Sequence, residues 1–187
     1  MTLGRLCCLV VVISILLIPG VGFHAAARPQ SAPDIGVNGF FSVDKAPRGR
    51  LIQAAVVIDI PQGFHVNANR PGNKYAIPTV LKIEAPSGIV VGPVNYPRAV
   101  VRRLKAVKNE PLATYEGHAR LRFNVTVPDS FQEGPTELKA RLRFQSCNDD
   151  VCFPPQTRDI SMPITVVGAR DPVKRINGEI FGNRRRG

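Results

Sequence analysis

The sequence predicts an all-β fold, a single β-sandwich of immunoglobulin-like architecture. The chain of 187 residues contains 17 prolines and 16 glycines, which separate many short apolar runs. Such spacing favours strands joined by turns. Three of the runs alternate strictly between apolar and polar residues, as half-buried strands do. Because the sequence has no long helical period, we expect one sandwich of about eight or nine strands.

Residues 1–27 are expected to be a secretory signal peptide rather than part of the sandwich. Arg5 precedes an apolar run over residues 6–18, and three alanines at 25–27 suit a signal peptidase. The run is shorter than the roughly 20 residues that a membrane-spanning helix needs. We therefore expect a periplasmic protein, and the alternative is a protein anchored to the membrane by an uncleaved amino-terminal segment.

The first half of the mature chain carries the less regular strands. Residues 28–37 are rich in proline and predict a flexible lead-in, so the domain is expected to span 38–168. The run over 51–60 is mostly apolar and β-branched, which predicts a central strand buried on much of both faces. Shorter strands are expected at 39–43, 80–84 and 64–68, the last as a short or edge strand.

The three alternating runs lie in the second half of the domain, and their apolar residues are expected to face the core. The last two runs bracket residues 145–155, which predicts a hairpin with this segment at its end. The expected inward residues are Leu121, Phe123, Val125 and Val127 in the first run, Leu138, Ala140, Leu142 and Phe144 in the second, and Ile160, Met162, Ile164 and Val166 in the third.

The formal net charge of +11 suggests attraction to acidic partners or anionic surfaces. The basic residues are spread singly along the strands, without a basic patch interleaved with aromatic residues, so no nucleic-acid partner is expected. We expect no small-molecule substrate either. The basic carboxy-terminal tail, residues 169–187, ends in three arginines at 184–186 that are expected to be solvated.

Cys147 and Cys152 are the cysteines that remain when Cys7 and Cys8 leave with the signal peptide. In an exported protein two nearby thiols can form a stable disulfide, and two cysteines allow one connectivity. The bridge would close a loop of only six residues, which stabilises a fold by about 2 kcal/mol, against almost 5 kcal/mol for a loop of about 100 residues. A purely structural bridge that pins the loop locally is one interpretation.

Thiol:disulfide exchange is the other interpretation, because it needs sulfurs that a partner can reach. A hairpin loop at one end of a sandwich meets this need. The neighbouring Asp149 and Asp150 disfavour a thiolate and raise thiol pKa, which slows attack on random disulfides. Pro154 and Pro155 stiffen the chain after the second cysteine.

A metal site is the third interpretation of the cysteine pair. Two thiolates are fewer than the four ligands of a structural zinc site. His65 and His118 could add nitrogen ligands, but neither has ligand-like spacing to the cysteines. We therefore expect neither a metal nor another cofactor.

Three segments together resemble the amino-terminal periplasmic domain of the thiol:disulfide interchange protein DsbD. They are Ser146–Pro155, which contains Phe153 and the pattern Cys-x4-Cys-x-Pro-Pro, Ile77-Pro78-Thr79, and Tyr115-Glu116-Gly117. The likeness covers roughly residues 38–167. The cysteine pattern after an alternating strand is fairly specific, whereas the other two segments are weak on their own.

The resemblance implies an immunoglobulin-like domain that acts as a protein-disulfide reductase carrier. It would take electrons from a thioredoxin-like protein, itself reduced by a DsbD- or CcdA-like membrane electron carrier. It would pass them to periplasmic proteins such as disulfide isomerases or the thioredoxins of cytochrome c maturation. The resemblance assigns the mixed disulfide with the partner to Cys152 and its resolution to Cys147. The alternative is a non-catalytic immunoglobulin-like binding module with a small structural disulfide.

This sequence departs from the family pattern in three respects. Four residues separate the cysteines, where the best-known members have five. Residues 100–112, which match the family's cap loop, have no clean strand period and no aromatic residue. We expect this segment to be a lid, with Leu104, Leu112 or Tyr115 shielding the sulfurs. The sequence also stops after the sandwich, so both redox partners are expected to be separate proteins.

Overall fold

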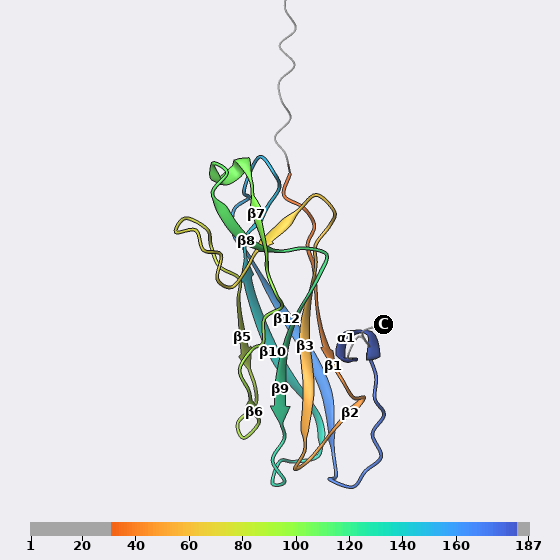
Figure 1. The fold of residues 1–187 in the computed structure, drawn as a ribbon. Coiled ribbons are helices and arrows are strands. Elements are labelled where there is room, and N and C mark those ends of the chain that lie inside the picture. The colour runs from red at the N-terminus through yellow and green to blue at the C-terminus, as the bar shows by residue number, and fades with distance from the viewer. Residues whose placement is uncertain (1–30, 183–187) are drawn as a thin grey trace, which may run out of the picture. The chain divides into compact units, whose positions relative to one another are not determined.

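The computed structural model describes residues 31–182 and confirms the predicted all-β, immunoglobulin-like sandwich (Figure 1). Twelve strands lie in this range, more than the eight or nine expected, because several are only two or three residues long. The strands are β1 (Gly36–Phe41), β2 (Lys45–Pro47), β3 (Leu51–Asp59), β4 (His65–Asn67), β5 (Val80–Glu84), β6 (Val90–Val91), β7 (Val100–Arg103), β8 (Pro111–Tyr115), β9 (His118–Thr126), β10 (Gly134–Phe144), β11 (Ser146–Cys147) and β12 (Gln156–Val167).

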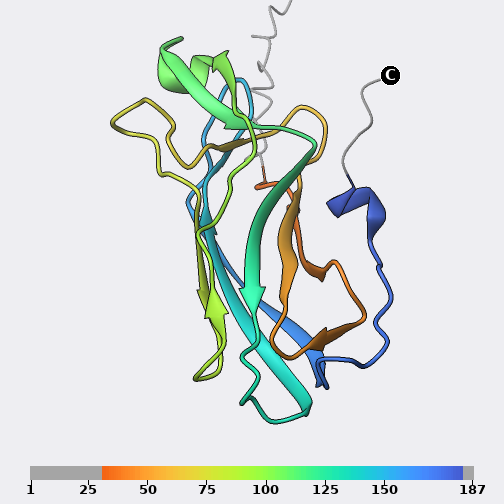
Figure 2. The ribbon, with the colours of Figure 1, turned by 60° about the horizontal axis from the view of Figure 1, so that its bottom comes forward.

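Two four-stranded sheets form the layers of the sandwich, in the orders β1-β3-β9-β6 and β2-β12-β10-β5 (Figure 2). β2 pairs with β12 in parallel, and the other strand pairs in these sheets are antiparallel. A third sheet, β11-β4-β8-β7, lies at the end of the sandwich drawn at the top of Figure 1. β4 is only three residues long, so of the two alternatives, a short strand or an edge strand, the short strand is confirmed, and it lies inside this sheet.

The alternating sequence pattern decides which side chains fill the core between the two sheets. Every residue expected to face inward on β9, β10 and β12, and Val127 just after β9, is buried or nearly so. β10 and β12 pair along the whole of β10, from Gly134 opposite Val166 to Phe144 opposite Gln156. This long antiparallel ladder ends where the cysteine segment begins, so it fixes the place of the cysteines at one end of the fold.

β3 is buried on both faces, as its apolar run predicts, because the chain after β12 covers its outer face. Ile180, in the short helix α1 (Gly178–Phe181), is buried in one cluster with Ala55 and Val57 of β3. The backbone N–H of Ile176 donates to the carbonyl of Ser42 at 3.0 Å. Figures 1 and 2 show α1 beside β1 and β3. Packing against the sheet thus continues past residue 168, while the arginines at 184–186 lie outside the described residues.

The segment 100–112 is more regular than its sequence predicts. It forms β7, a single 3-10 turn η1 (Lys105–Val107) and the start of β8, and β7 pairs with β8 from Val100 opposite Thr114 to Arg103 opposite Pro111. All four residues of β7 are exposed, so the strand has no apolar face. The sequence therefore shows no alternating pattern that would predict this hairpin. Lys108 turns the chain back with φ of 56°. We call residues 100–115 the cap hairpin.

Candidate functional site

Cys147 and Cys152 are joined by a disulfide at the end of the β10–β12 hairpin. Asn148 shapes the turn between them, since its side-chain oxygen accepts the backbone N–H groups of Asp150 at 3.0 Å and Val151 at 2.8 Å. Its own N–H donates to the carbonyl of Val151 at 2.9 Å. An asparagine that bonds the backbone two and three residues on is a common turn former, and Asn148 was not among the predicted site residues.

The two cysteines differ in burial. Cys147 is fully buried on β11, whereas Cys152 is partly exposed. Asp149 and Asp150 lie in the turn between them, and both are exposed to solvent. A partner can therefore approach this pair from the side of Cys152 and not from the side of Cys147.

The residues after Cys152 anchor the returning chain. Phe153 is buried, its ring lies 6.1 Å from the ring of Phe64, and its N–H donates to the carbonyl of Ser146 at 2.9 Å. Pro154 and Pro155 follow and are exposed. Phe153 thus holds the end of the loop to the sandwich, while the two prolines fix the path of the chain into β12.

The cap hairpin lies against the cysteine pair. Leu104 and Leu112 are buried in one apolar cluster with Cys147, and Ala106 and Cys152 pack against it. We call Leu104, Leu112 and Cys147 the cap cluster. The backbone N–H of Ala106 also donates to the carbonyl of Asp149 at 3.0 Å, which ties the tip of the hairpin to the turn between the cysteines.

Tyr115 does not belong to the cap cluster. It is buried in the main core between the sheets, its hydroxyl donates to the side-chain oxygen of Asn69 at 2.7 Å, and burial raises its pKa. The expectation that Leu104, Leu112 or Tyr115 covers the sulfurs therefore holds for the two leucines. Tyr115 instead fixes the end of β8 against the core.

The opposite side of Cys147 is formed by β4. His65 is the residue paired with Cys147 across the two strands, and Asn67 places its side-chain oxygen 3.9 Å from the Cys147 Sγ. A disulfide sulfur has no hydrogen, so this approach is a contact rather than a hydrogen bond in the oxidised protein. The Asn67 amide nitrogen donates to the carbonyl of Ile77 and to the side chain of Gln145, both at 3.0 Å, which orients its oxygen toward the sulfur.

A chain of charged groups links His65 to the cap hairpin. His65 Nδ1 lies 3.1 Å from Glu116 Oε1, and Arg102 of β7 binds the same carboxylate through Nε at 2.5 Å and Nη2 at 2.7 Å. The hydrogen bond from Arg102 holds the pKa of Glu116 below its usual range, and that of Arg102 is raised by the same bond. On the other side of the ring, Nε2 lies 3.6 Å from Asp149 Oδ1.

The three segments that carried the family resemblance meet at this site. Ile77 and Glu116 bind the residues of β4 that flank Cys147, as described above, and the third segment holds the cysteines themselves. His65, Asn67 and Arg102 were not predicted as parts of the site. No local signal marks them, since their relation to Cys147 arises from strand pairing between residues far apart in sequence.

Within residues 31–182, no group of three or more His, Cys, Asp or Glu side chains is arranged to hold a metal ion. In the same range, no helix has the length and apolar character needed to cross a bilayer.

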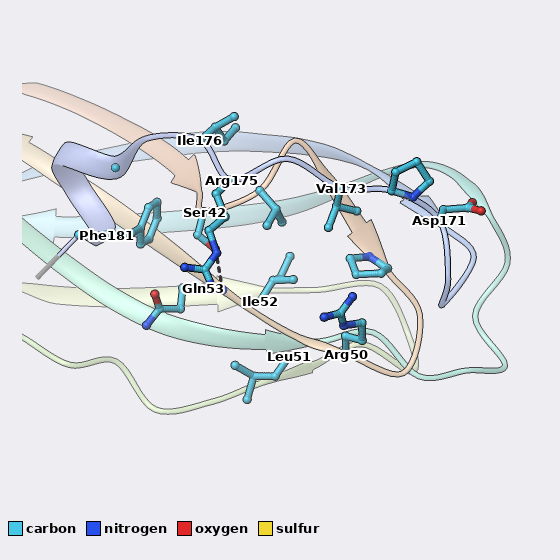
Figure 3. Close-up of a pocket in the computed structure, with 15 residues that line it drawn as sticks. Ser42, Arg50, Leu51, Ile52, Gln53, Asp171, Val173, Arg175, Ile176 and Phe181 are labelled. Carbon is cyan, nitrogen blue, oxygen red and sulfur yellow. Dashed lines mark hydrogen bonds between the residues drawn. The ribbon is translucent and has the colours of Figure 1, made fainter.

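A cavity of about 650 Å³ lies away from the cysteines, between the start of β3 and the segment after β12. Figure 3 shows Arg50, Leu51 and Gln53 on one side, with Val173 and Arg175 on the other. None of its lining residues belongs to the cysteine loop or to the cap hairpin. The cavity lacks a nucleophile beside a base, so the cysteine pair remains the candidate functional site.

Comparison with known proteins identifies the family of this chain. The sequence model of the family described as "Thiol:disulfide interchange protein DsbD, N-terminal" matches residues 38–163. The chain is similar to the crystal structure of the Neisseria meningitidis DsbD n-terminal domain in the reduced form, at 16% identity and a TM-score of 0.41, covering 74% of this chain and 88% of that chain.

A second similar structure is the N-terminal periplasmic domain of ScsB from Proteus mirabilis, at 15% identity and a TM-score of 0.47. That match covers 77% of this chain and 51% of the ScsB chain, about half of its length. A comparison with curated proteins gave no match.

Proposed function

This chain belongs to the family of the amino-terminal domain of the thiol:disulfide interchange protein DsbD, and from that premise we propose that it relays reducing equivalents between thioredoxin-like proteins through Cys147 and Cys152. The family is involved in thiol:disulfide exchange. The observation that carries the proposal is the asymmetric disulfide, with one sulfur buried under the cap hairpin and the other partly exposed.

In the proposed reaction the reduced protein acts on an oxidised partner in two steps. The Cys152 thiolate attacks one sulfur of the partner's disulfide, which breaks that bond and forms a mixed disulfide. Cys147 then gives up its proton and attacks the Cys152 Sγ, which releases the partner as a dithiol. Two electrons pass to the partner, and the Cys147–Cys152 disulfide is restored. Reduction by the electron donor is the reverse of this sequence.

We propose that the cap hairpin limits the reaction to docked partners. Cys152 packs against the cap cluster, so full access to its sulfur requires that Leu104 and Leu112 move away, and that the bond from Ala106 to the carbonyl of Asp149 breaks. The ion pair between Lys105 and Asp150, with 3.6 Å between Nζ and Oδ1, must also part, but both side chains are well exposed and contribute little. A partner that supplies its own apolar contacts can offset these losses.

The compartment and the electron donor form part of the same proposal. The DsbD amino-terminal domain is a periplasmic domain, and we propose the periplasm for this protein too. Residues 1–27, outside the described residues, would be its signal peptide. The donor would be a thioredoxin-like protein reduced through a DsbD- or CcdA-like membrane carrier.

Single cysteine variants test the proposal directly. Cys147→Ser cannot resolve the mixed disulfide, so we expect it to accumulate a covalent complex with a periplasmic thioredoxin-like protein, detected by non-reducing electrophoresis and mass spectrometry. Cys152→Ser is the matched control and is expected to trap little. Equal trapping by both variants would contradict the assigned roles. Trapping by neither variant would favour a binding module with a structural disulfide.

A further inference from the structure

We propose that His65 is the base that accepts the proton of Cys147 when the mixed disulfide is resolved. This inference rests on the proposed exchange reaction and adds to it a group that the cysteine pair itself does not provide. It follows from the environment of Cys147, from the pairing of β4 with β11, and from the ligands of the imidazole ring.

Cys147 needs a base because its surroundings favour the neutral thiol. The side chain is fully buried against Leu104 and Leu112, and burial in apolar surroundings disfavours a thiolate. In the reduced protein the S–H group would also face the side-chain oxygen of Asn67, 3.9 Å from the sulfur here. A hydrogen bond from the neutral form raises the cost of ionisation further. Only the thiolate attacks a disulfide efficiently.

Strand pairing brings His65 to this thiol. His65 and Cys147 are direct partners in the antiparallel pair of β4 and β11. Such partners project from the same face, with Cβ atoms about 4.5–5.5 Å apart. Val66 points the other way, into the main core, while Asn67 returns to the face of Cys147. The imidazole and the sulfur therefore share one side of the small sheet, and the His65 side chain is only 13% exposed.

The ligands of the ring leave one nitrogen free to accept a proton. A carboxylate can only accept a hydrogen bond, so the 3.1 Å contact with Glu116 places the hydrogen of the neutral ring on Nδ1. Nε2 is then unprotonated. It lies on the side of the cysteine loop, 3.6 Å from Asp149 Oδ1, a distance too long for a hydrogen bond.

Charged groups face His65 from two elements of the fold. Glu116 faces it from the β8–β9 connection, and Asp149 faces it from the cysteine loop. Arg102 of β7 binds Glu116 on the far side and keeps that carboxylate ionised and in place. Two carboxylates thus face one imidazole, at 3.1 Å and 3.6 Å. Histidine suits this task because its ordinary pKa of about 6.5 lies near neutrality.

The resolving step can then be written in full. In the mixed disulfide between Cys152 and its partner, His65 Nε2 takes the proton of the Cys147 thiol. The thiolate attacks the Cys152 Sγ, the bond to the partner sulfur breaks, and the partner leaves as a thiolate. That thiolate takes the proton from His65, directly or through water, so His65 ends the step neutral.

His65→Gln tests the inference, because glutamine keeps hydrogen-bonding atoms but does not titrate. Reduced full-length protein is mixed with glutathione disulfide, quenched with acid at timed intervals, and analysed by mass spectrometry for the protein–glutathione mixed disulfide. At pH 7 we expect the variant to resolve this species at least about tenfold more slowly than the wild type. As the pH rises well above the ordinary thiol pKa of about 8.5, more of the Cys147 thiol ionises without a base, so the two rates should converge.

His118→Gln is the matched control. His118 is also paired with a carboxylate, that of Asp59 at 2.6 Å, but its side chain is 71% exposed and Asp59 lies on β3, outside the cysteine loop. We expect wild-type kinetics from it. If His65→Gln resolves as fast as His118→Gln at pH 7, or remains slow at high pH, the inference is wrong.

A second variant and a small-molecule oxidant distinguish a failure of the role of His65 from a failure of the proposed relay. Glu116→Gln retains His65 but removes the carboxylate that fixes its Nδ1–H, so it should slow resolution by several-fold with the same recovery at high pH. It serves as the readout if His65→Gln does not fold. Glutathione disulfide reports on resolution without any protein partner. A pH-reversible slowing together with no trapped thioredoxin-like protein would therefore support the role of His65 and contradict the relay.

Discussion

The main core and the cap cluster are buried to the same degree and are held in different ways. Phe123 in the main core and Leu112 in the cap cluster are both almost completely inaccessible. Phe123 lies on β9, which pairs with β3 over nine consecutive residues. Leu112 lies on a hairpin whose outer strand, β7, has four exposed residues. Two clusters with equal burial can therefore differ in the free energy needed to expose them to solvent.

The difference lies in what must break to expose each cluster. The main core opens only if the ladders of the two large sheets separate, which is global unfolding. The cap cluster is closed toward the cysteine loop by the backbone bond from Ala106 to Asp149 and by the exposed ion pair of Lys105 with Asp150. Local opening of the cap hairpin is therefore expected to cost much less than unfolding. The following substitutions test this contrast.

The largest effect is expected in the main core, from Phe123→Ala. Removal of a buried aromatic side chain leaves a cavity between the sheets, and the free energy of unfolding should fall by about 3–5 kcal/mol. Urea denaturation followed by circular dichroism measures this loss. A loss below about 1 kcal/mol would mean that the core rearranges and that the contrast with the cap cluster is overstated.

Leu112→Ala tests whether access to the Cys147–Cys152 disulfide can change independently of the stability of the whole domain. It should lower the free energy of unfolding by about 2 kcal/mol or more, and it should also speed reduction of the Cys147–Cys152 disulfide by a small thiol several-fold. Leu138→Ala, the same change in the main core, is the control. It should destabilise the protein at least as much and leave the reduction rate under native conditions unchanged. Similar reduction rates in the two variants would contradict a lid that opens locally.

Replacement of both cysteines by serine should have a smaller effect on stability. The disulfide closes a loop of six residues, so the chain-entropy model gives a loss of about 2 kcal/mol or less. The loop is also held by the side chain of Asn148. We expect a folded double variant with the circular dichroism spectrum of the wild type. An unfolded or insoluble product would favour a structural role for the bridge.

Glu116→Gln is expected to have the smallest effect on stability, visible in its pH dependence. The hydrogen bond from Arg102 lowers the pKa of Glu116 in the folded protein, so the carboxylate stabilises the fold above the ordinary glutamate pKa of about 4.3. This contribution is lost as the pH falls through the lowered pKa. The wild type should therefore lose more stability than the variant between pH 5 and pH 3. Solvent screens the pair, whose side chains are 30% and 46% exposed, so the difference should be small.

Urea denaturation at several pH values measures this difference. The same measurement on His118→Gln shows the effect of removing a histidine–carboxylate pair that lies outside the site. Parallel pH profiles for wild type and Glu116→Gln would show that the network around His65 does not couple to folding.

Local sequence patterns are enough to predict several features of this protein. Strict alternation in β9, β10 and β12 specifies their inward faces, because side chains of a strand point to opposite sides at every second residue. It also placed the cysteines at the end of the last hairpin, and export with a single pair of cysteines predicted the disulfide. The pattern Cys-x4-Cys-x-Pro-Pro indicated the family, and the family model that matches residues 38–163 confirmed it.

The surroundings of the two sulfurs depend instead on contacts between segments that are far apart in sequence. His65 lies opposite Cys147 only because β4 pairs with β11, and Arg102 reaches Glu116 only because β7 pairs with β8. β7 has no apolar face, so no period in the sequence marked it as a strand. The outer face of β3 likewise gained its cover from Ile180, more than 120 residues further along the chain. Pairing and register between distant segments are set by the packing of the whole domain, and a local pattern cannot encode them.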